Sequence, residues 1–273
     1  MPKERILITV KTYPTLSAKY GELVCTAGLR EDGSWIRIYP VPFRSLEEFR
    51  KFKKYQIIEA QVMRNVKDPR PESHKVDFES LSLTDVKLST ADGWRERKNW
   101  ILARGRVYDD LTELIELANN QNHLSIATFK PSKILDFKAE AQSESWDENK
   151  IATLQQASKQ GDLFPEWQPQ SVTRYVKKLP WKFSYRLEDA KGRTSTMMIE
   201  DWEIGALYWG CLKDGATAEE AVQKVRQMYL NNFREKDLYL FLGTTREWHG
   251  RGKNPFVVIG AFYPPVQNQP ELF

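Results

Sequence analysis

Residues 237–265 read DLYLFLGTTREWHGRGKNPFVVIGAFYPP, and the rest of the predicted fold is built outward from this stretch. Two apolar runs, 238–243 and 256–263, are rich in Leu, Val, Phe and Tyr and have the length of buried strands. They predict a hairpin in which two rigid strands present a long loop. That loop gathers cations, an indole, an imidazole and an amide: Arg246, Arg251, Lys253, Trp248, His249 and Asn254.

The residues before this hairpin predict another hairpin and two helices. Residues 181–199 form the hairpin, because their first half alternates apolar and polar side chains and a DAKG turn follows at 189–192. Asp201 stands where the N-cap of a helix belongs, and the TAEE sequence at 217–220 is a capping box that opens a second helix. We therefore predict a C-terminal α+β domain over residues 173–273, made of hairpin, two helices and hairpin.

The first half of the chain predicts a small antiparallel β-barrel-like domain, assigned to residues 1–140. It holds short β-type runs separated by turn residues, at 6–12, 22–28, 35–39, 57–65 and 81–88. An Asp-Gly turn joins the second run to the third as a hairpin. Polar residues and two prolines mark 141–172 as a connecting segment. The predicted fold class is α+β, with the barrel-like domain first.

The amino-acid composition says more about the fold of the chain than about its function. The chain has 273 residues, of which 41% are hydrophobic, so it can form real cores, and its net charge of +4 is too slight to prove a polyanionic partner. Cys25 and Cys211 lie far apart in apolar surroundings and are expected to be reduced thiols. No secretion signal or apolar stretch of membrane-spanning length occurs. We expect a cytoplasmic protein without membrane, metal or cofactor.

The N-terminal half contains a second group of cations and aromatic residues. Its members predicted to contact a ligand are Lys11, Tyr13, Trp35, Arg37, Arg44, Lys53 and Lys54. Aromatic and basic side chains on curved β-surfaces are typical of proteins that bind single strands or bases. The alternative is that the aromatic residues are barrel core and the lysines are solvated. A third such cluster spans residues 94–106.

The predicted function is nucleic-acid binding, to DNA or RNA, through the loop and the N-terminal group, with no catalytic residue assigned and the question of an enzyme left open. A Trp beside arginines can stack on an unpaired base while the guanidinium groups contact phosphate. The ordinary alternative is a solvated hairpin tip, in which His249 is only a hydrogen-bonded loop residue. A second alternative is a metal-dependent nuclease that uses Glu200, Asp201 and Glu203, although acidic residues also favour a helix N-terminus. A third is an interaction subunit with a protein partner.

Several segments resemble a bacterial family of uncharacterised proteins. They are VCTAG at 24–28, WIRIYPVPFR at 35–44, IEDWE at 199–203, NPF at 254–256 and YPP at 263–265. The likeness spans most of the chain and implies an association with mobile elements and defence loci, which suits a nucleic-acid partner, but it brings no activity. The strand pattern of the N-terminal barrel also resembles PUA-like base-binding modules.

Overall fold

The N-terminal half folds into a closed barrel, as the sequence predicts. The computed structural model describes residues 3–17, 21–41, 46, 51–149, 151–152 and 176–267. The barrel strands, in their order around it, are β1 (Lys3–Lys11), β3 (Gly21–Arg30), β4 (Trp35–Val41), β6 (Ser73–Val76) and β5 (Gln56–Arg64). β1 pairs with both β3 and β5, and this double pairing closes the ring.

The barrel departs from the prediction in one strand. β6 has four residues and was not predicted. It lies between β4 and β5, pairing with β4 in parallel and with β5 in antiparallel orientation. Two further strands flank the ring: β2 (Thr15–Ser17) pairs with β3, and β7 (Ser82–Lys87) pairs with β5. Isoleucines fill the barrel interior, including Ile6, Ile8, Ile36, Ile38 and Ile58. Burial of these branched side chains stabilises the ring.

Outside the barrel and its flanking strands, the described residues form two sheets and several helices. One sheet is β10 (Lys133–Ala141), β11 (Trp181–Glu188) and β12 (Thr194–Met198). The other is β14 (Phe256–Phe262), β13 (Tyr239–Thr244), β9 (Ile126–Phe129) and β8 (Val107–Tyr108). The helical elements are α1 (Ala91–Lys98), η3 (Asn99–Ala103), α2 (Leu111–Asn119), α4 (Trp202–Lys213), α5 (Ala218–Arg226) and η4 (Gln227–Asn232). Among the described residues, none of these helices has the length and apolar character needed to cross a bilayer.

Helix starts follow the predicted caps. The Asp201 side chain accepts from the Glu203 amide and begins α4. Thr217 and Glu220 form both bonds of the capping box at the start of α5. Both hairpins form as expected, β11 with β12 and β13 with β14. The α+β fold class is therefore confirmed. The domain limits at residues 140 and 173 stay a prediction. Strand pairs cross these limits, because β9 pairs with β13 and β10 pairs with β11.

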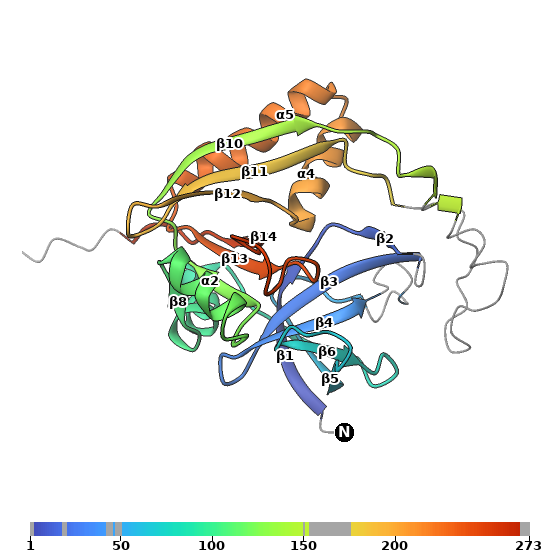
Figure 1. The fold of residues 1–273 in the computed structure, drawn as a ribbon, viewed down its shortest axis with the longest axis vertical. Coiled ribbons are helices and arrows are strands. Elements are labelled where there is room, and N and C mark those ends of the chain that lie inside the picture. Colours follow the sequence, from blue (N-terminus) through green and yellow to red (C-terminus); the bar gives the residue numbers. More distant parts are fainter. Residues whose placement is uncertain are drawn as a thin grey trace, which may run out of the picture.

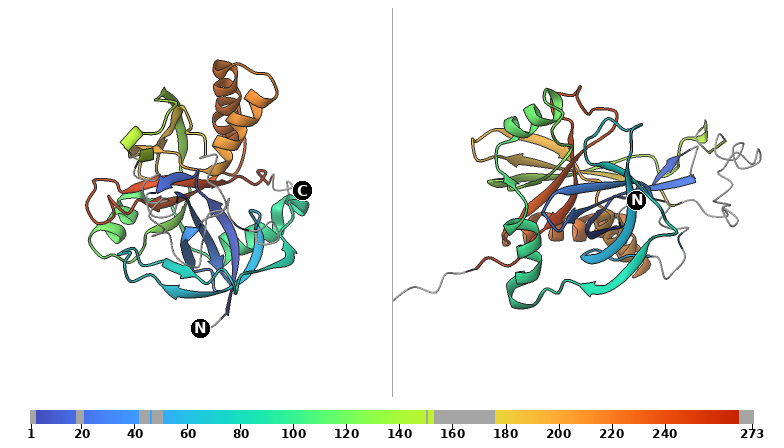
Figure 2. Two further views of the ribbon diagram at one scale, coloured as in Figure 1. Left: turned by 90° about the vertical axis from the view of Figure 1, so that its right-hand side faces the viewer. Right: turned by 90° about the horizontal axis from the view of Figure 1, so that it is seen from below.

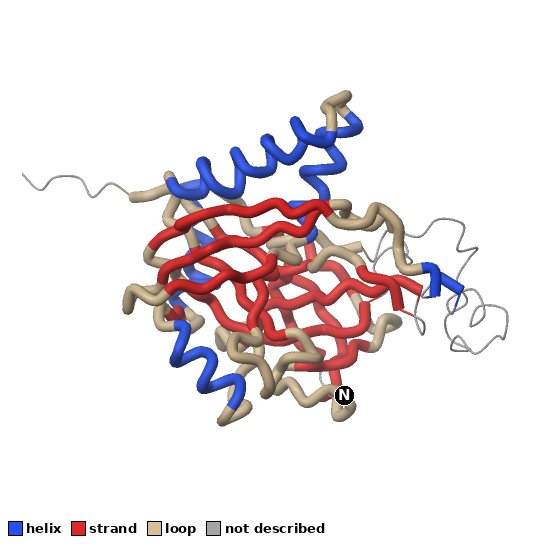
Figure 3. Tube along the Cα trace, turned by 45° about the horizontal axis from the view of Figure 1, so that its top comes forward, coloured by secondary structure: helices blue, strands red, loops and turns tan. Residues whose placement is uncertain are grey.

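One layer of the molecule joins its two halves. In Figure 1, β13 and β14 lie between the barrel and the sheet of β10, β11 and β12. Side chains alternate along β13, so that Phe241 packs with barrel residues such as Leu7, while Leu240 and Leu242 pack with the helices. Helices α4 and α5 stand at the end opposite the N-terminus (Figure 2), and strands fill the middle of the molecule (Figure 3). The barrel and the C-terminal half thus share a core.

Candidate nucleic-acid interface

The loop between β13 and β14 is held firmly at its base by His249. This imidazole is only 8% exposed. Its Nδ1 lies 3.0 Å from the Thr244 hydroxyl and its Nε2 lies 2.7 Å from Asn122 Oδ1. Burial lowers the pKa of His249, and the nearby Arg70 lowers it further. His249 is therefore a structural anchor, and its predicted contact with nucleic acid is corrected, because its two ring nitrogens are already used.

Further anchors fix the loop to three neighbouring segments. Asn119 donates to the Gly252 carbonyl at 2.7 Å, which ties the loop to the end of α2. Asn254 donates to the Ser195 hydroxyl at 2.9 Å, so this predicted ligand contact also has a structural role. Arg246 donates to the Lys67 carbonyl at 3.1 Å and links the loop to the connection between β5 and β6. These bonds hold the loop in one shape.

Five side chains of the loop face solvent: that of Glu247 and four that we call the loop surface, Arg246, Trp248, Arg251 and Lys253. Trp248 is 53% exposed, and among the described residues it is the only Trp, Tyr or Phe side chain in the exposed class. Glu247 is the one carboxylate within the loop. The loop surface therefore offers an uncovered indole beside three cations, as the sequence predicts.

A buried polar cluster lies directly beneath this loop, and we call it the junction. Its centre is the pair Arg70 and Asp68, whose nitrogen and oxygen are 2.6 Å apart and whose side chains are 5% and 3% exposed. Arg70 also donates to the Thr244 carbonyl at 2.9 Å, and Ser73 donates to Asp68 at 2.8 Å. Burial alone would raise the pKa of Asp68, but the bonds from Arg70 and Ser73 hold it well below its ordinary value.

Arg37 belongs to the junction and not to a binding surface. It is 2% exposed, and its Nη2 donates to the carbonyl and hydroxyl of Ser125 at 3.0 and 3.1 Å. The carboxylate of Glu72 accepts from the amide and hydroxyl of the same Ser125. Burial lowers the pKa of Arg37. The predicted phosphate contact of Arg37 is corrected, because its guanidinium is buried and bonded to Ser125.

Two aromatic residues of the N-terminal group are used in packing. Trp35 makes an edge contact with Phe241 at a ring-centroid distance of 5.2 Å. Tyr13 donates to the Lys177 carbonyl at 2.7 Å and accepts from the Trp209 indole at 2.8 Å. Both aromatic residues therefore connect the barrel to the C-terminal half, and the alternative of a packing role describes them better than base stacking.

The lysines of the N-terminal group have different surroundings. Lys54 pairs with Glu203 at 2.6 Å, and its side chain is 10% exposed. Burial alone would lower the pKa of Lys54, but Asp201 and other neighbours raise it above its ordinary value. Lys11 lies 5.3 Å from the ring centroid of Trp202, and burial lowers its pKa. Lys53 is exposed, and Arg44 lies outside the described residues.

Two residues of the acidic cluster considered for a nuclease, Asp201 and Glu203, have structural roles. Asp201 is buried and caps α4, while Glu203 is bound to Lys54. Burial raises the pKa of Asp201 to about 6 against the opposing effect of Lys54, and burial also raises the pKa of Glu200. Within the part of the chain that the structure describes, no three His, Cys, Asp or Glu side chains are grouped to hold a metal ion. No geometry here favours the nuclease alternative.

The third basic cluster stacks on its own aromatic residues. Arg97 lies 3.9 Å from the ring centroid of Tyr55 and 4.9 Å from that of Trp94. Arg104 lies 4.2 Å from the ring centroid of Trp100. These two guanidinium groups therefore already have aromatic partners within the protein, whereas Arg95 pairs with Asp92 at the surface.

The sequence missed the junction. The two prolines of the segment DPRPE at 68–72 are typical of a stiff surface connection, yet Asp68 and Arg70 are buried. The sequence feature that could have indicated burial is the alternation of Asp, Arg and Glu, which is unusual for a solvated turn. This alternation does not identify the residues to which these side chains are bonded. Thr244 and Ser125, which complete the network, lie far away in sequence.

Two family models match successive parts of the chain. A family model described as "Domain of unknown function (DUF8758)" matches residues 2–103, and one described as "Domain of unknown function (DUF8757)" matches residues 107–273. No curated protein matches the chain. Among solved structures, a murine DNA-binding protein bound to double-stranded DNA aligns over 100% of both chains with 8% identity and a TM-score of 0.31, too low to carry an argument.

Proposed function

The chain belongs to the DUF8757 family, and we propose that it binds nucleic acid through the loop surface of Arg246, Trp248, Arg251 and Lys253. One observation carries the proposal: the only exposed Trp, Tyr or Phe among the described residues lies in a loop with three exposed cations. An indole in water costs free energy unless a partner covers it, and a base can do so by stacking. The neighbouring cations then meet the phosphates on either side.

The anchoring of the loop supports the same proposal. His249, Asn119 and Asn254 hold the backbone on both sides of Trp248, so little conformational freedom is lost when a ligand binds. Because stacking on an indole requires an unpaired base, we expect single strands to bind more tightly than duplexes. The predicted ligand is either DNA or RNA. A role in a bacterial defence or mobile-element context stays a prediction.

Fluorescence anisotropy with labelled single- and double-stranded DNA and RNA tests the proposal. Replacing Trp248 by Ala is expected to lower single-strand affinity by about tenfold, because stacking contributes about 1–3 kcal/mol per base. The combined variant Arg246→Ala, Arg251→Ala, Lys253→Ala is expected to lower affinity for every nucleic acid, because it removes phosphate contacts.

The matched control removes three exposed lysines elsewhere, in the variant Lys138→Ala, Lys213→Ala, Lys224→Ala. It lowers the net charge equally and is expected to retain most of the affinity. If both triple variants lose the same affinity, general charge explains binding and the loop assignment is wrong. If no nucleic acid binds and a protein partner covers Trp248 instead, the proposal fails in favour of an interaction subunit.

A further inference from the structure

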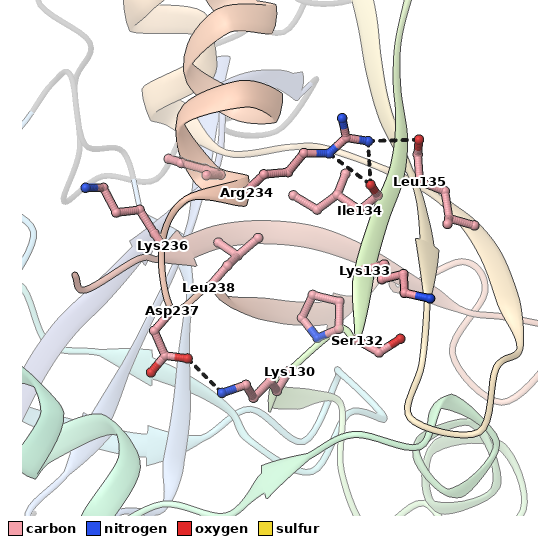
Figure 4. Close-up of a pocket in the computed structure, with 11 residues that line it drawn as sticks. Lys130, Ser132, Lys133, Ile134, Leu135, Arg234, Lys236, Asp237 and Leu238 are labelled. Atoms are coloured by element: carbon pink, nitrogen blue, oxygen red, sulfur yellow. Dashed lines mark hydrogen bonds and ion pairs between the residues drawn. The ribbon is translucent and has the colours of Figure 1, made fainter. Parts of the chain in front are cut away.

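A cavity of about 530 Å³ lies at the other end of β13 from the loop surface. Two segments far apart in sequence form it, residues 130–135, which lead into the start of β10, and residues 233–238, which precede β13. Four cations line it, Lys130, Lys133, Arg234 and Lys236, against the single carboxylate of Asp237. Figure 4 shows Arg234 on one side of the cavity and the pair of Lys130 and Asp237 on the other.

Arg234 is held in place by the backbone of β10. Its Nε and Nη2 donate to the Ile134 carbonyl at 3.1 and 2.7 Å, and Nη2 also donates to the Leu135 carbonyl at 3.0 Å. These bonds leave Nη1 for another acceptor, and they offset none of the guanidinium charge, because a carbonyl is neutral. Arg234 is therefore a positioned cation without a carboxylate partner among the described residues.

The opposite side of the cavity combines a cation with an acceptor. Lys130 donates to Asp237 at 2.7 Å and to the Tyr239 hydroxyl at 3.3 Å. Burial alone would lower the pKa of Lys130, but these two bonds raise it, so the ammonium group stays charged. Tyr239 also donates to Asp237 at 3.0 Å. This side can accept hydrogen bonds from a ligand through Asp237, while Lys130 balances the charge of that carboxylate.

The cavity is separate from the loop surface. β13 runs from Tyr239 beside the cavity to Thr244 beside the loop, a span of about 17 Å at about 3.3 Å per residue. A small molecule cannot reach both. The remaining lining includes Ile134, Phe233 and Leu238, so apolar surface lies between the charged groups. Charge at the margins with an apolar interior suits an anion that has an organic body.

We propose that this cavity binds a small organic phosphate of about mononucleotide size. Arg234 contacts the phosphate with its positioned guanidinium. Lys236 points away from Arg234 in Figure 4, and its exposed side chain turns toward the bound phosphate to add a second positive charge. The body of the ligand lies on Leu238 and Ile134, and Asp237 accepts from its hydroxyl groups. The volume lies within the range of about 300–1,000 Å³ that is usual for small-molecule sites.

Calorimetric titration with AMP, ribose 5-phosphate and inorganic phosphate tests this site, and adenosine is the control without phosphate. We expect saturable binding of AMP, competition by inorganic phosphate and no binding of adenosine. Lys236→Glu is expected to weaken AMP binding by at least about tenfold, because it reverses an exposed charge at the phosphate. Lys213→Gln, at an exposed lysine of α4, is expected to change nothing.

Arg234→Gln is a second variant, and thermal unfolding verifies that it still folds. The proposal is overturned if none of the three phosphates binds, if adenosine binds as well as AMP, or if folded Lys236→Glu and Arg234→Gln proteins bind AMP unchanged. A loss of single-strand DNA or RNA binding in Lys236→Glu also overturns it, because the cavity would then belong to a nucleic-acid track. The loop surface is tested separately and can fail independently.

Discussion

Two arginine-containing regions only a few ångströms apart have opposite surroundings. In the junction, Arg37 and Arg70 are buried and bound to Ser125, Asp68 and the Thr244 carbonyl. In the loop surface directly after Thr244, Arg246 and Arg251 face solvent. A buried charge must be satisfied by the protein itself, whereas an exposed one is available to a partner. The same residue type is therefore structural in one region and a candidate ligand contact in the other.

The largest expected effect comes from removing an arginine of the junction. Arg70→Ala leaves Asp68 buried without its cation and is expected to destabilise the fold by about 3–5 kcal/mol. Urea unfolding at pH 7 measures the change. The matched control is Arg95→Ala, whose pair with Asp92 is 73% and 66% exposed and should cost less than about 1 kcal/mol. Equal losses in the two variants would contradict the division into buried and exposed arginines.

The two tryptophans Trp35 and Trp248 sharpen the comparison. Trp35→Ala removes a ring packed on Phe241 and is expected to destabilise by about 2–4 kcal/mol without changing nucleic-acid affinity at a temperature where the variant is folded. Trp248→Ala is expected to change stability by no more than about 0.5 kcal/mol and to reduce affinity. Thermal unfolding and anisotropy on the same samples distinguish the two roles. A reduced affinity in folded Trp35→Ala protein would show that the barrel surface also binds.

A smaller, pH-dependent effect is expected at Asp201, where α4 meets the barrel. Its pKa is raised to about 6, so the folded state binds a proton more tightly than the unfolded state does. The contribution of Asp201 to stability is thus complete below about pH 4 and is lost as the pH rises through about 6. The charged groups that interact with it include Lys54, Glu203 and Lys11, and the Tyr229 hydroxyl donates to it.

Asp201→Asn keeps a side-chain cap for α4 but cannot ionise. We expect the stability of the variant relative to the unchanged protein to increase by about 2 kcal/mol between pH 4 and pH 7. Urea unfolding at several pH values measures this difference. A difference that does not change with pH would mean that Asp201 is charged throughout and is fully compensated by Lys54.

Local sequence signals predicted most of the elements but not their contacts. Alternation and turns identified the hairpins, and Asp201 and Thr217 marked the starts of α4 and α5, because caps and strand periods depend on neighbouring residues. β6 was missed because four residues carry too little pattern. Its parallel pairing with β4 depends on a connection that no local signal specifies.

The same limit separates the two groups of candidate site residues. The loop between β13 and β14 is exposed by its position, so its cations could be assigned from sequence alone. Trp35 and Arg37 lie on a strand face that is solvent-exposed in an isolated barrel and covered only when β9 and β13 pack against it. Such a face is buried or exposed depending on contacts with residues about 90 and 200 positions away in the chain. The apolar and polar pattern of a single strand carries no information about these contacts.

The salt dependence of nucleic-acid affinity tests the central claim most directly. The logarithm of affinity should fall linearly with the logarithm of salt concentration, with about 0.7 lost per neutralised phosphate of a single strand. If the loop surface binds phosphate, the variant Arg246→Ala, Arg251→Ala, Lys253→Ala should have a slope shallower by about two. The lysine control variant should retain the original slope. An unchanged slope in the loop variant would contradict the claim that these cations contact nucleic acid.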